Sequence, residues 1–243
     1  MKKQRLDVAL VERGVVETRS KAQSLIMARR VTVNGQYVDK AGAGVAGDDE
    51  VVVVALEHPW VGRGGMKLAR ALEAFGIGVL GKVCADIGAS TGGFTDVMLQ
   101  NGAARVYAID VGYGQLDASL RNDPRVVNRE KVNARYLEAG DFDEPIEFLS
   151  IDVSFISLTM ILPAVAKFLR GELVALIKPQ FEVGKRDIGK GGIVRDEAKR
   201  AAAVDAVVTF AHDAGFEVRG TIESPVKGAE GNVEYLMYAA TSP

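Results

Sequence analysis

The stretch Lys82-Val83-Cys84-Ala85-Asp86-Ile87-Gly88-Ala89-Ser90-Thr91-Gly92-Gly93 decides the fold of this chain. Its first half is a short, mainly apolar run that predicts a buried strand, and its second half is a glycine-rich turn. A helical pattern follows from about Gly93 to Asn101. A strand, a glycine turn and a helix in this order predict an α/β unit with a ligand pocket at the carboxyl end of the strand.

The sequence on both sides of this turn continues to alternate between helix and strand. The spacing of Leu68, Ala71, Leu72 and Phe75 predicts a helix ahead of the turn. Further strands are expected at residues 105–110, 125–128, 148–153, 173–177, 218–222 and 233–239, with helices at 161–168 and 195–214. Residues 63–243 are therefore expected to form a Rossmann-like α/β domain, doubly wound around a mostly parallel seven-stranded sheet.

The N-terminal part of the chain has a different pattern. Two short helical repeats, around Leu6–Leu10 and Ala22–Ile26, precede a β-branched run from Val31 to Val38 that is interrupted by Asn34-Gly35, a strong hairpin signal. Residues 1–57 are expected to form a small α+β domain. Because Pro59 blocks regular structure, residues 58–62 are expected to be a linker between the two domains.

Composition narrows the class of protein. The 243 residues carry a formal net charge of -2, yet residues 1–30 contain eight basic and three acidic groups, which leaves a local charge of +5. This asymmetry predicts a polyanion-binding surface at one end of an acidic body. The single cysteine, Cys84, excludes an internal disulfide framework, and we find no apolar run of about 18 residues and no signal-peptide core. The expected location is the cytoplasm, without a membrane.

The glycine turn favours a cationic nucleoside cofactor. Ser90 stands where a dinucleotide fingerprint requires its middle glycine, and the acid Asp86 precedes the turn, where it would repel a phosphate. S-adenosylmethionine carries an ammonium and a sulfonium but no phosphate, so it is the expected cofactor; a dinucleotide site and a purely structural turn are the alternatives. Asp110 ends the next strand, where an acid can accept hydrogen bonds from ribose hydroxyls. Asn133 follows the third strand, where it either contacts adenine or caps a turn.

The expected cofactor-binding residues are Asp86, Gly88, Ser90, Thr91, Gly92, Gly93, Phe94, Asp110, Asn133 and Asp152.

Four charged residues are expected to meet at the same edge of the sheet. Asp152 ends one buried strand, Lys178 follows another, and Lys67 and Glu234 lie on the first helix and a late strand. A sugar hydroxyl is a poor nucleophile at neutral pH, so its methylation needs a base that is held in line. Lys178 is the expected base, with Asp152 orienting it; Lys67 supplies a neighbouring positive charge and Glu234 orients Lys67.

These features together resemble the FtsJ-type ribose 2′-O-methyltransferases, which use a Lys-Asp-Lys-Glu tetrad. The resemblance is carried by Arg63 to Leu68, Asp86 to Asp96, Ser150 to Ser157, Lys178 to Glu182, Gly189 to Val194 and Gly231 to Tyr235. With the N-terminal part included, nearly the whole chain resembles the TlyA family, whose members are named both as haemolysin A and as rRNA methyltransferases. The resemblance implies methylation of the cytidine 2′-hydroxyl in ribosomal RNA of the small subunit, and in some members of the large subunit. No metal is expected.

A second resemblance concerns the N-terminal domain. The run from Arg5 to Asp7, the run from Ser20 to Ile26 and the hairpin from Val31 to Gly35 are similar to the S-four-type RNA-binding domain. That domain presents basic side chains to RNA phosphates, which position the RNA without reading its bases. With Arg63 and a glycine-rich loop after Phe181 added, the expected RNA contacts are Arg5, Arg19, Ser20, Lys21, Gln23, Arg29, Arg63, Lys185, Arg186 and Lys190.

Other activities fit the sequence less well. Methylation of an exocyclic amine is disfavoured because Asp152-Val153-Ser154-Phe155 lacks the paired prolines of those enzymes, and methylation of pyrimidine carbon 5 is disfavoured because Cys84 lies inside a strand. Two further alternatives are a non-catalytic RNA-binding ribosome assembly factor and a haemolysin-like membrane-active protein. The presence of all four charged residues argues against the first, and we find no amphipathic membrane segment to support the second.

Overall fold

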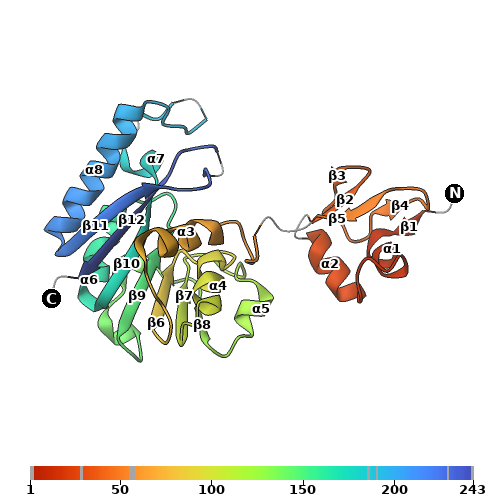
Figure 1. The fold of residues 1–243 in the computed structure, drawn as a ribbon, viewed down its shortest axis with the longest axis horizontal. Helices are drawn as coiled ribbons and strands as arrows, with labels where there is room; N and C mark the ends of the chain where they lie inside the picture. The colour runs from red at the N-terminus through yellow and green to blue at the C-terminus, as the bar shows by residue number, and fades with distance from the viewer. Residues whose placement is uncertain are drawn as a thin grey trace. The chain divides into compact units, whose positions relative to one another are not determined.

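The computed structural model describes residues 3–27, 30–54, 58–184, 187–189, 191–228 and 230–241. The chain divides into two units, Met1–Pro59 and Trp60–Pro243. Figure 1 shows the first unit in red and orange and the second from orange through blue. This division falls within residues 58–62, the segment that we expect to be the linker.

The first unit is a small α+β structure. Its elements are β1 (Gln4–Arg5), α1 (Leu6–Glu12), α2 (Arg19–Met27), β2 (Val31–Val33), β3 (Gln36–Tyr37), β4 (Gly44–Val45) and β5 (Val51–Val53). The strands form a three-stranded sheet in the order β3-β2-β5 and a separate β1-β4 pair. The expected hairpin is present, because Asn34 and Gly35 both adopt positive φ angles, 50° and 77°, between β2 and β3.

A small apolar core holds this unit together. Leu6, Leu10, Ile26 and Val31 are each fully buried in a cluster of residues that all belong to the first unit. The helical spacing of Leu6, Leu10 and Ile26 in the sequence therefore corresponds to the faces that α1 and α2 turn toward the core.

The second unit is built on a seven-stranded sheet in the order β11-β12-β10-β9-β6-β7-β8. In chain order the strands are β6 (Val83–Ile87), β7 (Arg105–Ile109), β8 (Val126–Arg129), β9 (Ile146–Ile151), β10 (Leu169–Ile177), β11 (Phe216–Glu223) and β12 (Tyr235–Thr241). The pairs from β10 to β8 are parallel, whereas β12 is antiparallel to both of its neighbours. The expected mostly parallel sheet is thus confirmed.

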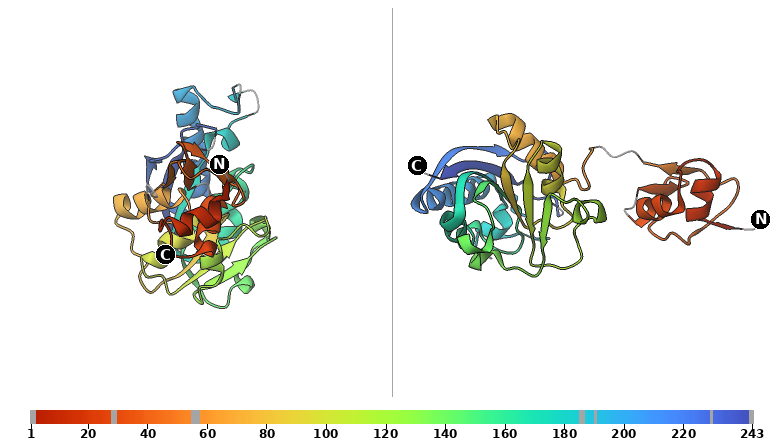
Figure 2. Two further views of the ribbon diagram at one scale, coloured as in Figure 1. Left: turned by 90° about the vertical axis from the view of Figure 1, so that its right-hand side faces the viewer. Right: turned by 90° about the horizontal axis from the view of Figure 1, so that it is seen from below.

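Helices cover both faces of this sheet (Figure 2). One face packs on α3 (Gly65–Phe75), α4 (Gly93–Gln100) and α5 (Ala118–Arg121), and the other on α6 (Leu162–Phe168) and α8 (Glu197–Asp213). The shorter elements among the described residues include α7 (Pro179–Glu182) and the 3-10 turns η1 (Ala134–Tyr136), η2 (Ala139–Asp141) and η3 (Leu158–Met160). All five residues of β6 are buried, as expected for a central strand that is covered on both sides.

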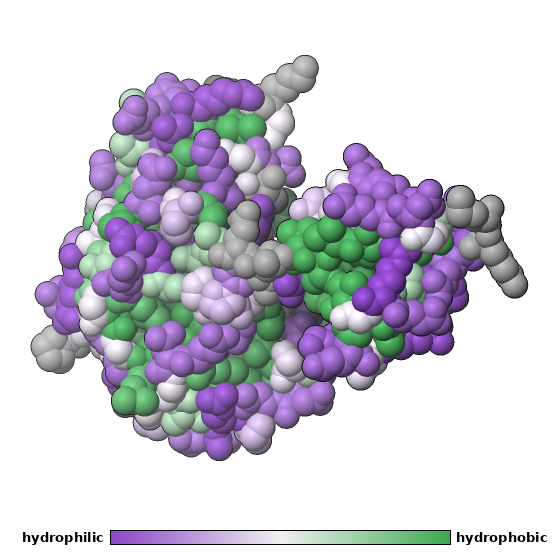
Figure 3. Space-filling model, turned by 45° about the vertical axis from the view of Figure 1, so that its right-hand side comes forward, coloured by the Kyte–Doolittle hydropathy of each residue, from purple (hydrophilic) through white to green (hydrophobic). Residues whose placement is uncertain are grey.

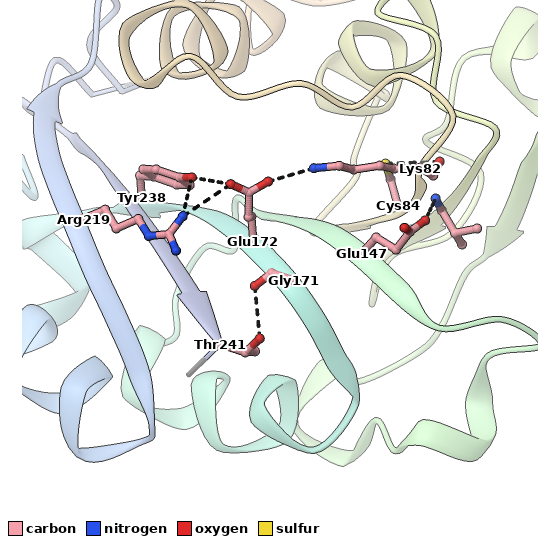
Figure 4. A network of polar contacts seen from close by, with 9 residues as sticks. Lys82, Cys84, Glu147, Gly171, Glu172, Arg219, Tyr238 and Thr241 are labelled. Carbon is pink, nitrogen blue, oxygen red and sulfur yellow. Dashed lines mark hydrogen bonds and ion pairs between the residues drawn. The ribbon is translucent and has the colours of Figure 1, made fainter. Parts of the chain in front are cut away.

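Polar side chains of β10, β11 and β12 form a network away from the carboxyl edge of the parallel strands (Figure 4). The Glu172 carboxylate of β10 receives a hydrogen bond from Lys82 Nζ at 2.8 Å and another from the Tyr238 hydroxyl of β12. Arg219 of β11 donates to the same hydroxyl at 3.1 Å. This Glu172 network therefore fastens the antiparallel edge of the sheet to the segment that begins β6.

On the face that Figure 3 shows, the surface of each unit mixes polar and apolar residues. Large exposed side chains include Tyr37 in the first unit and Tyr113, Tyr136 and Phe155 in the second. Within the described ranges, every helix is too short or too polar to span a bilayer.

Candidate active site

A cavity of about 630 Å³ opens at the carboxyl edge of the sheet in the second unit. Lys67, Asp152, Lys178 and Glu234 all line it, although they are far apart in the sequence. Lys67 comes from α3, whereas Asp152 and Lys178 directly follow β9 and β10, and Glu234 directly precedes β12. Asp152 and Lys178 meet because the carboxyl ends of neighbouring parallel strands lie at one edge, and the start of the antiparallel strand β12 places Glu234 at the same edge. Lys67 reaches this edge from α3.

Within the cavity the four residues form two ion pairs. Lys67 Nζ lies 2.7 Å from Glu234 Oε2, and Lys178 Nζ lies 2.6 Å from Asp152 Oδ1. Lys67, Lys178 and Glu234 are buried, with exposed fractions of 8%, 7% and 2%. A buried charge is costly unless it is paired, so each lysine is stabilised where it lies by its carboxylate partner. The structure thus reproduces both expected pairings.

A second cavity of about 600 Å³ lies beside the first and is lined by Asp110, Asn133 and Asp152. Gly88, Ser90, Asp152, Ser154 and Phe155 line both cavities. The two cavities therefore share the glycine turn and Asp152 as a common wall.

Two polar residues of the second cavity are held in place by the backbone. The Asp110 carboxylate accepts hydrogen bonds from Ser90 N at 2.8 Å and from Gly112 N at 2.6 Å. Asn133 Oδ1 accepts from Arg135 N at 3.2 Å and so caps η1 while the residue lines the cavity. Of the two alternatives for Asn133, capping of a turn is observed, and contact with adenine stays a prediction that its place in the cavity lining allows.

The glycine turn needs its glycines for different reasons. Gly88 has a φ of +83°, and a Cβ on it would lie 2.5 Å from the carbonyl oxygen of Asp152. The turn can therefore approach Asp152 only with glycine at this position. Thr91, Gly93 and Phe94 line the first cavity. Gly92 is not among the described lining residues of either cavity, because its α-carbon faces Leu116 and Leu120 around α5.

Asp86 has a different environment from the expected one. It is fully buried, and its carboxylate accepts hydrogen bonds from Thr95 N, Thr95 Oγ1 and Ser150 Oγ at 2.9, 2.7 and 2.9 Å. Burial raises the pKa of Asp86 to about 6, against the opposing effect of these hydrogen bonds. Asp86 is not among the described residues that line the cavities, so it joins β6, α4 and β9 instead of facing a ligand. The sequence shows that Asp86 stands next to the turn, but it does not show that the side chain points toward Thr95 of α4.

The segment that leads into α3 packs against α4 and α3 itself. Val61 N donates to Asp96 Oδ2 of α4 at 2.8 Å, and Trp60 lies against Gly65, where a Cβ would meet its ring at 2.7 Å. Arg63, an expected RNA contact, lines the first cavity. Residues from Trp60 onward therefore belong structurally to the second unit.

In the first unit, three expected RNA contacts share a partner. Arg5 and Arg19 form ion pairs with Asp7 at 3.0 and 2.9 Å, and Gln23 Nε2 donates to the same carboxylate at 2.8 Å. Asp7 is fully buried, and the hydrogen bond from Arg5 holds its pKa well below the usual range, with burial opposing and Gln23 and Arg19 adding to the effect.

The remaining expected RNA contacts fall into two groups. Ser20 and Lys21 are exposed on α2. Arg29, Lys185, Arg186 and Lys190 lie outside the described residues.

Several residues around the cavity did not enter the sequence-based set. Ser154 Oγ accepts a hydrogen bond from Lys178 Nζ at 2.9 Å, and Gln180 Nε2 donates to Glu234 Oε1 at 3.4 Å. Phe155 is 90% exposed and its ring centroid lies 5.1 Å from that of Phe181. For Gln180 and Phe181 the available signal was the short run from Lys178 to Glu182, in which both follow the lysine after Pro179.

Comparison with known proteins identifies the family. The family model described as FtsJ-like methyltransferase matches residues 60–241, and the S4 domain model matches residues 4–51. A protein of Bacillus subtilis named putative rRNA methyltransferase YqxC is 47% identical over 240 residues, which cover 98% of this chain and 85% of that protein. The Mycobacterium tuberculosis protein named 16S/23S rRNA (cytidine-2′-O)-methyltransferase TlyA is 46% identical over 240 residues, which cover 98% and 90%. The chain belongs to the TlyA family.

Solved structures agree with this membership in the TlyA family. A structure described as a putative hemolysin from Streptococcus thermophilus has a TM-score of 0.77 and 47% identity, covering 100% of this chain and 90% of that one. A putative S-adenosylmethionine-dependent methyltransferase from Listeria monocytogenes has a TM-score of 0.56 at 16% identity, covering 74% of this chain and 99% of that one. The second likeness shows that the larger unit of this TlyA-family chain has the methyltransferase fold.

Proposed function

We propose that this chain methylates the ribose 2′-hydroxyl of cytidine in ribosomal RNA, with S-adenosylmethionine as the methyl donor. The observation that carries the proposal is the Lys178–Asp152 pair at the junction of the two cavities. A methyl transfer requires the donor and the acceptor hydroxyl to meet in line at one point, and this junction supplies such a point.

The residues of the second cavity fit S-adenosylmethionine. Asp110 offers carboxylate oxygens that its two backbone partners orient, as binding of ribose hydroxyls requires. The turn at Gly88 has no room for a side chain, which is the usual mark of a backbone that must approach a ligand or a neighbouring strand closely. The bound cofactor would supply an electrophilic methyl group on its sulfonium. Asp110, Asn133, Gly88 and Ser90 would hold its nucleoside, and Asp152 would lie nearest its positive charge.

The first cavity supplies the groups that the acceptor needs. The hydroxyl oxygen would form a bond to the methyl carbon as the bond from that carbon to the sulfonium sulfur breaks and its electron pair stays on sulfur as a neutral thioether. The hydroxyl proton would pass to Lys178 in its neutral amine form, the only form of lysine that can act as a base. Asp152 and Ser154 hold Lys178 Nζ at 2.6 and 2.9 Å, so the base has a fixed position before the acceptor arrives. The Lys67–Glu234 pair lines the same cavity, where we assign it the role of positioning the acceptor ribose.

The first unit is assigned the binding of ribosomal RNA. Exposed Arg19, Ser20 and Lys21 on α2 present cationic and polar groups to phosphate, and the ion pairs of Arg5 and Arg19 with Asp7 fix the directions of the guanidinium groups. Such contacts give affinity and placement, whereas the second unit performs the reaction. The relative named 16S/23S methyltransferase makes both subunits candidate substrates.

Transfer of labelled methyl from S-adenosylmethionine to purified 30S and 50S subunits tests the proposal. We expect alkali-resistant label on cytidine of at least one subunit, and a loss of about 100-fold or more in the Lys178→Ala variant because the base is removed. Lys167→Ala is the matched control, since Lys167 is an exposed lysine remote from the cavity. Normal turnover by Lys178→Ala would refute the assignment of the base. Tight binding of a subunit without any methyl transfer would instead favour an RNA-binding assembly factor.

A further inference from the structure

The loop between β9 and η3 carries residues of the proposed active site. It begins at Asp152, whose backbone N donates to Ile87 O at 2.9 Å, and it ends at Ser157, which caps η3 through Thr159 N at 3.1 Å. Between these ends lie Ser154, which accepts the hydrogen bond from Lys178, and Phe155. The position of this loop therefore decides what surrounds the Lys178 amine.

The middle of the loop is conformationally strained. Phe155 has a φ of +62°, a region that bulky residues with a Cβ rarely occupy, and its side chain is 90% exposed. A residue in this conformation persists only when the surrounding structure imposes it. Phe155 is hardly buried and contacts Phe181 through its ring, so the constraint on its backbone comes from this contact and from the two ends of the loop.

Glu182 fastens the far end. Its carboxylate accepts a hydrogen bond from Ser157 Oγ at 2.5 Å and a second from Leu158 N at 2.9 Å. Glu182 is the last residue of α7, which starts directly after Lys178, so the same short segment carries both the base and the clamp on the loop. Burial raises the pKa of Glu182 above its ordinary value, and the hydrogen bonds from Ser157 and Leu158 oppose that rise.

We propose that Glu182 is a positioning residue of the active site: it fixes the Asp152–Ser157 loop at Ser157 and Leu158, and so keeps Ser154 against the Lys178 amine. Glu182 is not among the described residues that line the cavity, so it acts through the loop and does not touch the acceptor. This inference rests on the proposed function, in which Lys178 takes the proton of the hydroxyl. Without the clamp, the loop can relax the φ of Phe155 and withdraw Ser154 from Lys178.

Substitutions at Glu182 distinguish positioning from general stability. We expect Glu182→Ala to lower kcat for methyl transfer about 10- to 100-fold, the cost of misplacing a reacting group by about 1 Å, with the affinity for S-adenosylmethionine unchanged. Glu182→Gln should stay close to wild type, because the amide can still accept from Leu158 N and bond to the Ser157 hydroxyl. Glu197→Ala is the control for loss of an exposed carboxylate.

A double-mutant cycle with Ser154→Ala tests the route of the effect. If Glu182 acts through Ser154, adding Glu182→Ala to Ser154→Ala should reduce kcat much less than it reduces that of the wild type. Independent, additive losses would show that Glu182 affects kcat by a route that does not involve Ser154, and would overturn the inference. Unchanged kcat in Glu182→Ala would overturn it directly.

Hydrogen exchange gives a readout that does not depend on activity. In the full chain, Glu182→Ala should speed exchange at Leu158 and its neighbours in the loop while the amides of β6 keep their protection. If exchange at Leu158 does not change, the clamp does not exist and the inference fails, whatever the kinetics. If the wild type transfers no methyl group to either subunit, the proposed function fails and with it the positioning role; faster exchange would then show the clamp as a structural feature alone.

Discussion

At the scale of single residues, the raised pKa of Asp86 predicts how the free energy of unfolding depends on pH. Its carboxylate is fully buried, and burial raises its pKa to about 6 from an ordinary value of 3.8. Between these two pH values the folded protein holds more protons at this site than the unfolded chain does. The contribution of Asp86 to the free energy of unfolding therefore falls as pH rises from about 4 to 6, by roughly 3 kcal/mol in total.

The Asp86→Asn variant removes this titration and keeps the shape of the group. Its amide can accept from Thr95 and donate to Ser150, so we expect the variant to gain stability relative to wild type across that pH range. Urea unfolding followed by the fluorescence of Trp60, the only tryptophan and a part of the second unit, measures the difference. If the free energies of unfolding of wild type and variant, plotted against pH, stay parallel from pH 4 to 7, the raised pKa of Asp86 is contradicted.

The same residue shows what sequence can and cannot predict about the site. Asp152, Lys178 and Glu234 could be predicted to meet, because the alternation of helices and strands along the chain indicates which strand ends share an edge, and the resemblance to a known family adds Lys67. The burial of Asp86 and the packing of Gly92 could not, because they depend on which neighbouring element each residue faces. Ser154 and Glu182 were missed because their contacts depend on the path of a loop, which has no periodicity to read.

At the scale of elements, the Glu172 network predicts a stability effect that is separate from activity. Burial would raise the pKa of Glu172, but the hydrogen bonds from Lys82 and Tyr238 outweigh it and hold the pKa below its ordinary value. Glu172→Ala should therefore cost about 1–3 kcal/mol, since it leaves both partners without their acceptor.

Glu217→Ala, which removes an exposed partner of Arg219, should cost much less and serves as the control. Thermal unfolding measures the stability of both variants. At a temperature where both are folded, kcat should be unchanged, because Glu172 lies on β10 six residues before Lys178 and away from the cavity. A large loss of kcat with normal stability would show that the network has a role in the reaction.

The elements themselves were largely predictable, with differences at their ends. The expected strand at 82–87 and helix at 93–101 are observed at Val83–Ile87 and Gly93–Gln100. The strand expected at 148–153 instead spans Ile146–Ile151, because the chain leaves the sheet at Asp152 to form the loop above the cavity. The β1-β4 pair was not expected: each strand has two residues, too few to show alternation.

At the scale of the whole molecule, the two units have separate cores, and this separation predicts separable binding. The apolar cluster of the first unit draws only on residues from Leu6 to Val53, whereas both cavities are lined by residues from Gly62 onward. Removing residues 1–55 should therefore leave affinity for S-adenosylmethionine nearly unchanged and weaken binding of ribosomal RNA at least 10-fold, because the cationic groups on α2 are lost.

Titration calorimetry measures the affinity for S-adenosylmethionine. Filter binding at several salt concentrations measures the affinity for ribosomal subunits. The slope of log K against log salt should also become shallower in the shortened chain, by about 0.7 to 0.9 for each phosphate contact that is lost. The calorimetric affinity serves as the control for folding of the remaining unit. Equal losses of both affinities would mean that the first unit supports the cofactor site as well, so that binding of RNA and of S-adenosylmethionine cannot be independent.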